Sequence, residues 1–285
     1  MPKPNELGKS LRHYLIVQRR IQRSLGGPIV LAEEANQLFR DTEYGDLITF
    51  EEDIARIAAV VMVIAESAGS LAELGAFATN DTIRSALLVL GQSKFSSDES
   101  FVRFGPMERV KKYDDTRLAF YPWRVRGDGQ IIKASISGHY SRIGQLINKQ
   151  LSRVPNEQLY RTATGGLGAF VEILWILHIC SAMPVSELHS FRQSLFAENI
   201  EQREIKNKLY CMKLAGWVSS YSYENKEYWY TKSIEDPFRY RFRQGVNAND
   251  STRRKVEAMA AAKSALKVPK HVLRIVADAK SVIVK

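Results

Sequence analysis

The apolar run Val60–Ala65 places the strongest constraint on how this chain can fold. It is followed by a turn of small residues and a helical pattern, and a second apolar run covers Ala86–Leu90. Strands that are apolar on both faces are typical of parallel sheets covered by helices. Because parallel strands need a crossover between them, this spacing predicts a βαβ unit within an α/β fold.

The region before this unit has a less regular pattern. We expect an amphipathic basic helix within the first 25 residues, a short strand at Ile29–Leu31 and a helix over Glu33–Phe39. Thr49 and Glu52 stand at the spacing of a capping box, so the next helix is expected to begin there.

The second half of the chain predicts a different domain. A helix is expected within Ser135–Val154, and Pro155 with the glycines around Gly166 marks a boundary. Helices then follow at Ala169–Cys180, from Pro184, and at Ile200–Leu214, before a β-hairpin over residues 217–231. Three helices and a hairpin are the order of a winged helix. We therefore expect an α/β domain over 1–125, a helical connector over 126–165, a winged-helix domain over 166–237 and a basic tail over 238–285.

Charge is concentrated at the C-terminal end of the chain. The net charge is +10, and residues 239–285 hold twelve Lys and Arg against three acidic residues. Such a tail attracts phosphate backbones, which favours a nucleic-acid neighbour; a solvated basic end is the alternative.

The remaining composition excludes several classes of protein. No apolar run is long enough to span a bilayer and the first residues lack the apolar stretch of a signal peptide, so we expect a cytoplasmic protein. Cys180 and Cys211 lie in apolar helical patterns without metal-ligand spacing, and both are expected to be buried and reduced. No metal site and no bound cofactor are expected.

The candidate chemical site is the segment from Glu66 to Phe77. It follows a buried strand, and ligands of open α/β sheets bind at the carboxyl ends of strands. Helix amides with the hydroxyls of Ser67 and Ser70 suit a phosphate or a ribose hydroxyl. Glu73 would supply a carboxylate for attack on an anomeric carbon, as in retaining glycosidases, and Glu66 would bind a ribose hydroxyl or guide a water. The alternative is structural, because Ser70 and Glu73 also have capping-box spacing.

Three segments carry a resemblance to a known family. ESAGSLAELGAFATN (66–80), DLITFEEDIA (46–55) and SKFSSDESFVRFGPMERVKKYD (93–114) together resemble the nucleoside-deoxyribosyltransferase-like effectors of bacterial retrons. The resemblance implies a flavodoxin-like, nucleoside-deoxyribosyltransferase-like domain followed by a winged helix. It also implies Glu73 as nucleophile, with Asp46, Gly69 and Asn80 joining Glu66, Ser67 and Ser70 as substrate-binding candidates.

The resemblance also implies an activity and partners. The expected reaction is cleavage of an N-glycosidic bond, with NAD as first substrate and other nucleotides as second. NAD suits this chemistry because nicotinamide leaves as a neutral base without a strong general acid. The implied partners are a reverse transcriptase and its multicopy single-stranded DNA (msDNA), which would hold a toxic effector in check until phage infection, in an oligomer or filament. The chain departs from the family at its start, where a basic helix stands in place of the usual first strand.

The predicted winged helix offers a second set of candidates. Arg203, Lys206 and Lys208 on its third helix and Lys226 in the hairpin turn suit contacts with phosphates or with a protein partner. The tyrosines of the hairpin suit base stacking or an ordinary core. Two non-enzymatic hypotheses therefore stay open: a DNA-binding regulator that senses a nucleotide, and a structural subunit of a nucleoprotein filament.

Overall fold

The computed structural model divides the chain into two compact units. Unit 1 comprises residues 1–29 and 48–158, and unit 2 comprises 30–47 and 159–285. Within them the structure describes residues 10–18, 28–31, 39, 42–155, 157, 160, 166–196, 199–238, 259, 261 and 265–281. Most of the basic tail, the helix expected at Glu33–Phe39 and much of the first 25 residues lie outside these ranges.

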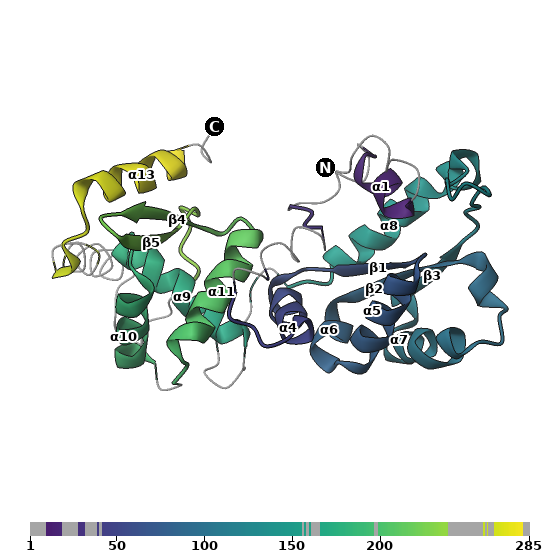
Figure 1. Cartoon of the computed structure of the whole chain (residues 1–285), viewed down its shortest axis with the longest axis horizontal. Helices are drawn as coiled ribbons and strands as arrows, with labels where there is room; N and C mark the ends of the chain where they lie inside the picture. Colours follow the sequence, from purple (N-terminus) through teal and green to yellow (C-terminus); the bar gives the residue numbers. More distant parts are fainter. Residues whose placement is uncertain are drawn as a thin grey trace, which may run out of the picture. The chain divides into compact units, whose positions relative to one another are not determined.

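Unit 1 is built around a parallel three-stranded sheet, whose strands run in the order β1-β2-β3 (Figure 1). The two strands expected from the apolar runs are confirmed as β1 and β2; β3 was not foreseen. The strands are β1 (Val61–Ala65), β2 (Leu87–Gln92) and β3 (Leu118–Tyr121). The helices are α1 (Leu11–Ile16), α4 (Leu47–Ile57), α5 (Ala68–Thr79), α6 (Asp81–Ala86), α7 (Glu108–Tyr113) and α8 (Tyr140–Leu151). Shorter helical turns are η1 (Ser93–Ser96), η2 (Arg103–Met107), η3 (Asp115–Arg117), η4 (Lys133–Ser135) and η5 (Ser137–His139).

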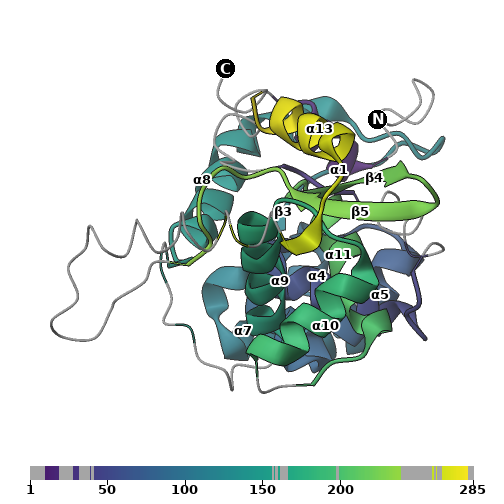
Figure 2. The same cartoon turned by 90° about the vertical axis from the view of Figure 1, so that its left-hand side faces the viewer.

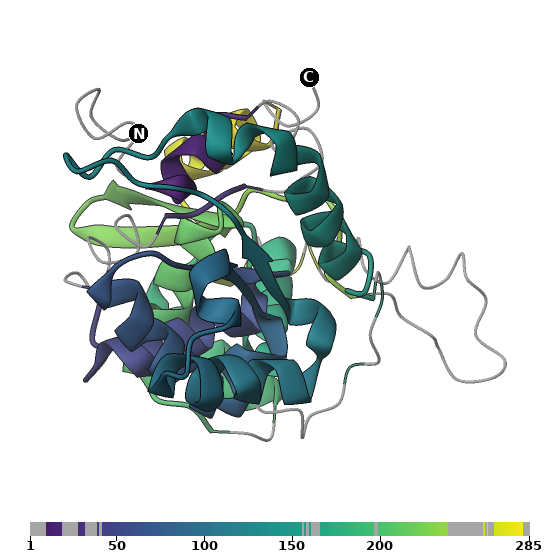
Figure 3. The ribbon, with the colours of Figure 1, turned by 90° about the vertical axis from the view of Figure 1, so that its right-hand side faces the viewer.

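Side chains alternate along the strands and so feed two cores. Val63 and Leu87 belong to the core that includes residues of α5 and α7, whereas Ile64 and Leu88 belong to the core that includes residues of α1 and α8. Figure 3 shows α1 and α8 on one side of the sheet and α5 and α7 on the other. Both connections between consecutive strands use the same face, as right-handed crossovers require. The sheet is therefore covered on both faces, which explains why its strands read as continuous apolar runs.

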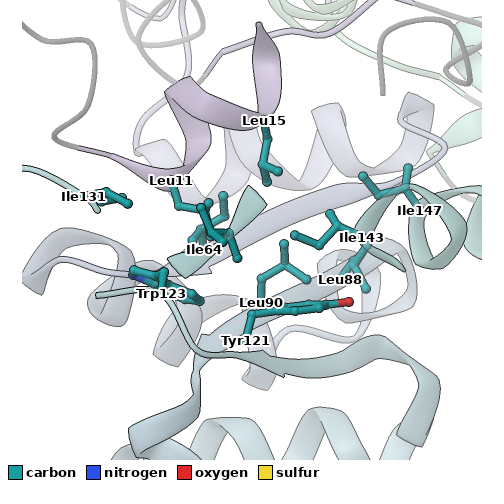
Figure 4. Close-up of a cluster of buried hydrophobic side chains, with 11 residues drawn as sticks. Leu11, Leu15, Ile64, Leu88, Leu90, Tyr121, Trp123, Ile131, Ile143 and Ile147 are labelled. Atoms are coloured by element: carbon teal, nitrogen blue, oxygen red, sulfur yellow. The ribbon is translucent and has the colours of Figure 1, made fainter. Parts of the chain in front are cut away.

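Helix α1 covers the sheet face beside α8. Leu11 and Leu15 are 0% and 1% exposed and pack over Ile64, Leu88 and Leu90 (Figure 4). Burial of two leucines stabilises this arrangement by roughly 1.5–3 kcal/mol each. The strand expected at Ile29–Leu31 is not formed. These residues have no regular secondary structure.

Two helix starts differ from the sequence expectation. α4 begins at Leu47, so Thr49 lies inside it, and the side chain of Glu52 instead accepts a hydrogen bond from Asn80. α8 falls within the expected connector, but its Ile143 and Ile147 are buried in the core of unit 1, and it is described with that unit.

Unit 2 contains three helices and a hairpin in the expected order. They are α9 (Leu167–Cys180), α10 (Val185–Leu195), α11 (Gln202–Leu214), β4 (Val218–Tyr223) and β5 (Lys226–Thr231), followed by α13 (Lys270–Ser281). The strands β4 and β5 pair antiparallel, and Met183, between α9 and α10, forms a further antiparallel bridge with Trp229.

Helix α13 lies over one face of this hairpin, and α9 and α11 lie on the other (Figure 2). Val272 and Val276 pack against Tyr228 and Tyr230, while Trp229 points the opposite way and meets Tyr210 of α11 at 5.5 Å between ring centres. Since both faces are covered, Tyr228 and Tyr230 are core residues, which contradicts their use as base platforms.

Candidate functional site

The turn between β1 and α5, together with the first turn of α5, carries four of the seven predicted catalytic and substrate-binding residues. Ser67 is the N-cap of α5, and its hydroxyl accepts the amide of Ser70 at 3.2 Å. The Ser70 hydroxyl accepts the amides of Glu66 and Ser67 at 3.1 and 3.0 Å and donates to the Ser67 carbonyl. The capping box is therefore Ser67 with Ser70. The expected box of Ser70 with Glu73 is wrong, because α5 begins two residues before Ser70.

Gly69 lies in the first turn of α5 and is exposed. A Cβ at this position would meet only the Ser67 hydroxyl oxygen, at 3.9 Å. Nothing in the local packing requires a glycine here. The missing side chain leaves the helix start open to close approach from solvent, as a ligand bound to helix amides needs.

Both carboxylate oxygens of Glu66 contact the N-terminal helix. The Ser10 hydroxyl donates to Glu66 Oε1 at 2.5 Å, and the Leu11 amide donates to Oε2 at 2.7 Å. Ser10 is also the N-cap of α1, accepting the Arg12 amide at 3.1 Å. The start of α1 therefore contacts a predicted substrate-binding residue.

Glu73 stands in the second turn of α5 and is exposed, on the same helix as the serine turn. Sequence reasoning missed its neighbour Glu51, a half-buried residue of α4. Burial, together with the charge of Glu73, raises the pKa of Glu51 to about 7. The site thus pairs an exposed carboxylate with a carboxyl that titrates near neutral pH, a combination typical of acid–base chemistry. The only sequence feature that could have pointed to Glu51 is its position in the segment 46–55, which carries part of the family resemblance.

Two further predicted residues lie outside the first two turns of α5. Asn80 is the C-cap of α5, about 20 Å along the helix from Ser67. Its side-chain oxygen Oδ1 caps α6 by accepting the Ile83 amide, and its side-chain amide donates to Glu52. Asp46 is exposed and belongs to unit 2. The cluster in unit 1 therefore consists of Glu66, Ser67, Gly69, Ser70 and Glu73, with Glu51 added.

Exposed aromatic side chains follow β2. Phe101 and Phe104 are 85% and 63% exposed, beside a π-helical turn that contains Pro106 and packs against α5. Arg103 pairs with Glu108 at 2.9 Å and lies near the ring of Phe104. Large exposed apolar groups and π-helical turns both concentrate at functional sites.

The basic candidates of unit 2 have neighbours within the chain. Lys208 is 9% exposed and its Nζ lies 4.8 Å from the ring centre of Phe170, so it is a core residue and the expectation that it contacts a partner is wrong. Lys206 pairs with Glu43 at 2.8 Å, Arg203 with Glu201 at 2.8 Å, and Lys226 with Glu187 at 3.8 Å. The hydrogen bond from Lys206 to Glu43 raises the pKa of Lys206.

The segment at Glu43 and Tyr44 also contacts α11 elsewhere. The Glu43 amide donates to Asn207 Oδ1 at 2.8 Å, and the Tyr44 hydroxyl lies 3.3 Å from the sulfur of Cys211. Cys180 and Cys211 are both buried and unbridged, as expected, and burial raises the pKa of Cys180 to about 11.

The described residues hold neither a membrane-spanning helix nor a metal-binding cluster. None of their helices is long and apolar enough to cross a membrane. In the same ranges, no group of three or more His, Cys, Asp or Glu side chains gathers closely enough to hold a metal ion.

Unit 1 is thus an α/β unit with a polar turn and a carboxylate-bearing helix at the carboxyl edge of a parallel sheet, where such folds bind ligands. Residues 8–220 match the family described as the STM3845 retron effector protein. Because this match covers most of the chain, the protein belongs to that family of retron effectors.

Two curated proteins of Escherichia coli are similar to parts of the chain. The retron Ec86 protein is 35% identical over 68 residues, which are 24% of this chain and 22% of that protein. The retron Ec73 protein is 23% identical over 157 residues, 53% of this chain and 50% of that protein. Both are named, provisionally, as ribosyltransferase/DNA-binding proteins. The chain therefore spans half or less of the length of the curated relatives it matches.

Proposed function

We propose that this retron effector cleaves an N-glycosidic bond of NAD or a related nucleotide, with Glu73 as the nucleophile. The observation that carries the proposal is the exposed Glu73 carboxylate on the helix whose start presents Gly69 and the Ser67–Ser70 box at the carboxyl edge of the sheet. The ribosyltransferase in the names of two relatives supports a glycosyl-transfer chemistry.

The reaction proceeds in two steps. The Glu73 carboxylate attacks the anomeric carbon of the nicotinamide ribose, the C–N bond breaks with its electron pair moving to nicotinamide, and a glycosyl ester forms. Water then attacks the anomeric carbon and Glu73 leaves as carboxylate, which yields ADP-ribose, free nicotinamide and one proton. Glu51 accepts that proton, because a carboxyl with a pKa of about 7 is a base matched to neutral pH.

The other residues of the turn bind the substrate. The α5 amides and the exposed surface at Gly69 receive a phosphate or a sugar hydroxyl, and Glu66 binds the ribose. Asp46 and Asn80 are retained only as candidates outside this cluster. The effector works in the cytoplasm and needs no metal and no bound cofactor.

Unit 2 is proposed to be a winged-helix domain that docks the effector to a reverse transcriptase and its msDNA. The order of three helices and a hairpin supports this, as does the single antiparallel bridge between Met183 and Trp229, which ties the segment before α10 to the hairpin. The exposed cations Arg203 and Lys226 remain candidates for that contact, with Lys206 after release from Glu43. These partners would hold the toxic activity in check before phage infection.

The deciding experiment measures release of nicotinamide and of nucleobases. Wild-type protein, Glu73→Gln and the control Glu99→Gln, an exposed glutamate outside the cluster, are each incubated with NAD and then with a nucleotide mixture. We expect release by wild type and Glu99→Gln, and a loss of about 10³-fold or more in Glu73→Gln with unchanged folding. If Glu73→Gln keeps its activity, Glu73 is not the nucleophile.

The principal alternative function is that of a nucleic-acid-binding regulator without enzymatic turnover. The term DNA-binding in the names of the two relatives supports this alternative. If wild type releases no base from any substrate, even when the reverse transcriptase, msDNA and a phage trigger are supplied, the enzymatic proposal fails. Retained nucleic-acid binding in that protein would then support the regulator, or a structural filament subunit.

A further inference from the structure

The start of α1 donates two hydrogen bonds to Glu66 in the same arrangement that the two hydroxyls of a bound diol would use. Each carboxylate oxygen accepts one hydrogen bond, Oε1 from the Ser10 hydroxyl and Oε2 from the Leu11 amide. An ionised carboxylate accepts hydrogen bonds on both oxygens and donates none. Two donors side by side, one to each oxygen, are also what the adjacent 2′- and 3′-hydroxyls of a ribose present.

The remaining polar groups of the turn are satisfied without this contact. Ser67 and Ser70 cap α5 through each other, and the Glu66 amide donates to the Ser70 hydroxyl. The Glu66 carboxylate is therefore not needed for the start of α5, and its partners come from a segment 55 and 56 residues earlier in the chain.

We propose that Glu66 is the receptor for the vicinal diol of a ribosyl substrate, and that the start of α1 occupies this receptor when substrate is absent. The inference rests on the proposed function and adds two properties to it. The effector prefers ribonucleotides to deoxyribonucleotides, and its free form is held in check by its own N-terminal helix.

The energies are compatible with such an exchange. Charge-assisted hydrogen bonds are the strong ones, so the Ser10 and Leu11 donors compete effectively with water. A substrate diol replaces these two donors one for one. The Ser10 hydroxyl and the Glu66 carboxylate lie at the surface, whereas the amide of the buried Leu11 reaches water only when the first turn of α1 moves toward solvent. Leu15, in the last turn of α1, keeps the helix near the sheet, so release involves the first turn of α1, which contains Leu11, rather than loss of the whole helix.

The first test changes Ser10. Ser10→Ala removes the donor to Oε1 and the cap of α1, both of which weaken the occupied state. We expect the KM for NAD to fall by roughly three- to tenfold with little change in kcat. Ser10→Thr keeps a hydroxyl donor and should behave as wild type, and Ser85→Ala, a serine at the opposite end of the strands, controls for surface substitution. A KM that rises in Ser10→Ala would show that α1 supports Glu66, and would overturn the proposal.

The second test follows the Leu11 amide itself and does not depend on turnover. In Glu73→Gln, hydrogen exchange at Leu11 is measured by NMR with NAD, and separately with an NAD analogue that lacks the 2′-hydroxyl of the nicotinamide ribose. We expect faster exchange with NAD and little change with the analogue. Equal exchange with both ligands contradicts diol recognition. If wild type nevertheless releases nicotinamide, the proposed function stands and only this inference fails.

Discussion

Two helices were expected to bind ligands or partners, α5 at the sheet edge of unit 1 and α11 in unit 2. Their polar side chains differ in exposure and in the contacts they make within the chain. At the start of α5, Glu66 and Ser67 are exposed even though their side chains are hydrogen-bonded, and Gly69 is exposed as well. On α11, Lys208 and Asn207 are buried and Lys206 is paired with Glu43. In this chain the polar residues after the buried strand are thus open to a ligand, whereas the cations predicted on α11 contact groups of the chain itself.

The largest effect is expected at a buried ion pair between α9 and α10 of unit 2. Arg192 and Glu172 form an ion pair that is 0% and 3% exposed. Arg192→Ala would leave a buried carboxylate without this cation, and we expect about 3–5 kcal/mol lower free energy of unfolding. Arg203→Ala, whose ion pair with Glu201 is largely exposed, should change stability by less than about 0.5 kcal/mol. Urea unfolding of the full chain measures both, and similar values for the two variants would contradict the burial described.

The next test separates the lysines of α11. Lys208→Ala removes a buried stem that packs on Phe170, and we expect a loss of about 1–3 kcal/mol in stability. Lys206→Ala should change stability by at most about 1 kcal/mol. Filter binding to single-stranded DNA alongside urea unfolding distinguishes the roles. If Lys208→Ala weakened DNA binding without destabilising the fold, the structural assignment of Lys208 would be wrong.

A third prediction uses the carboxyl beside Glu73. The pKa of Glu51 is raised in the folded state, so its contribution to stability is complete below about pH 4.5 and is lost as pH rises through about 7. Between about pH 5 and pH 8 we expect this group to cost on the order of 1–2 kcal/mol, allowing for its partial exposure. Glu51→Gln should remove that part of the pH dependence, and Glu99→Gln should retain it. Parallel wild-type and Glu51→Gln profiles in urea unfolding would refute the shift.

The smallest expected effect tests the cap of α5. Ser67→Ala should destabilise the helix start by about 1 kcal/mol, because the Ser70 amide loses its acceptor. Glu73→Gln should change the stability of the same helix start by less than about 0.5 kcal/mol. Hydrogen exchange of the first α5 amides reports on both. An effect of Glu73→Gln as large as that of Ser67→Ala would restore a capping role for Glu73.

The sequence predicts the elements of this fold better than their packing. The apolar runs predicted β1 and β2, and the order of three helices and a hairpin in unit 2 was also correct. β3 was missed because four residues, Leu118–Tyr121, are too few for a clear pattern. α8 was expected as a connector because its amphipathic pattern does not say which sheet it covers.

The site shows the same limit. The turn from Glu66 to Ser70 was predicted because ligand sites follow strands, a rule that depends on local order along the chain. Glu51 and the contact of Ser10 with Glu66 were not predicted, because they join residues far apart in the sequence. Asn80 was grouped with the turn because it ends the segment 66–80 that carries the family resemblance, although the whole of α5 separates them.

The position of α13 has a practical consequence for experiments on the basic C-terminal end. A deletion that removes residues 265–285 to reduce charge would also remove Val272 and Val276 from Tyr228 and Tyr230. The truncated protein would present an aromatic surface to solvent, and any loss of solubility or gain of nonspecific adhesion would be misread as an effect of charge. Substituting exposed lysines and arginines of that end by glutamine changes the charge and leaves the aromatic layer covered.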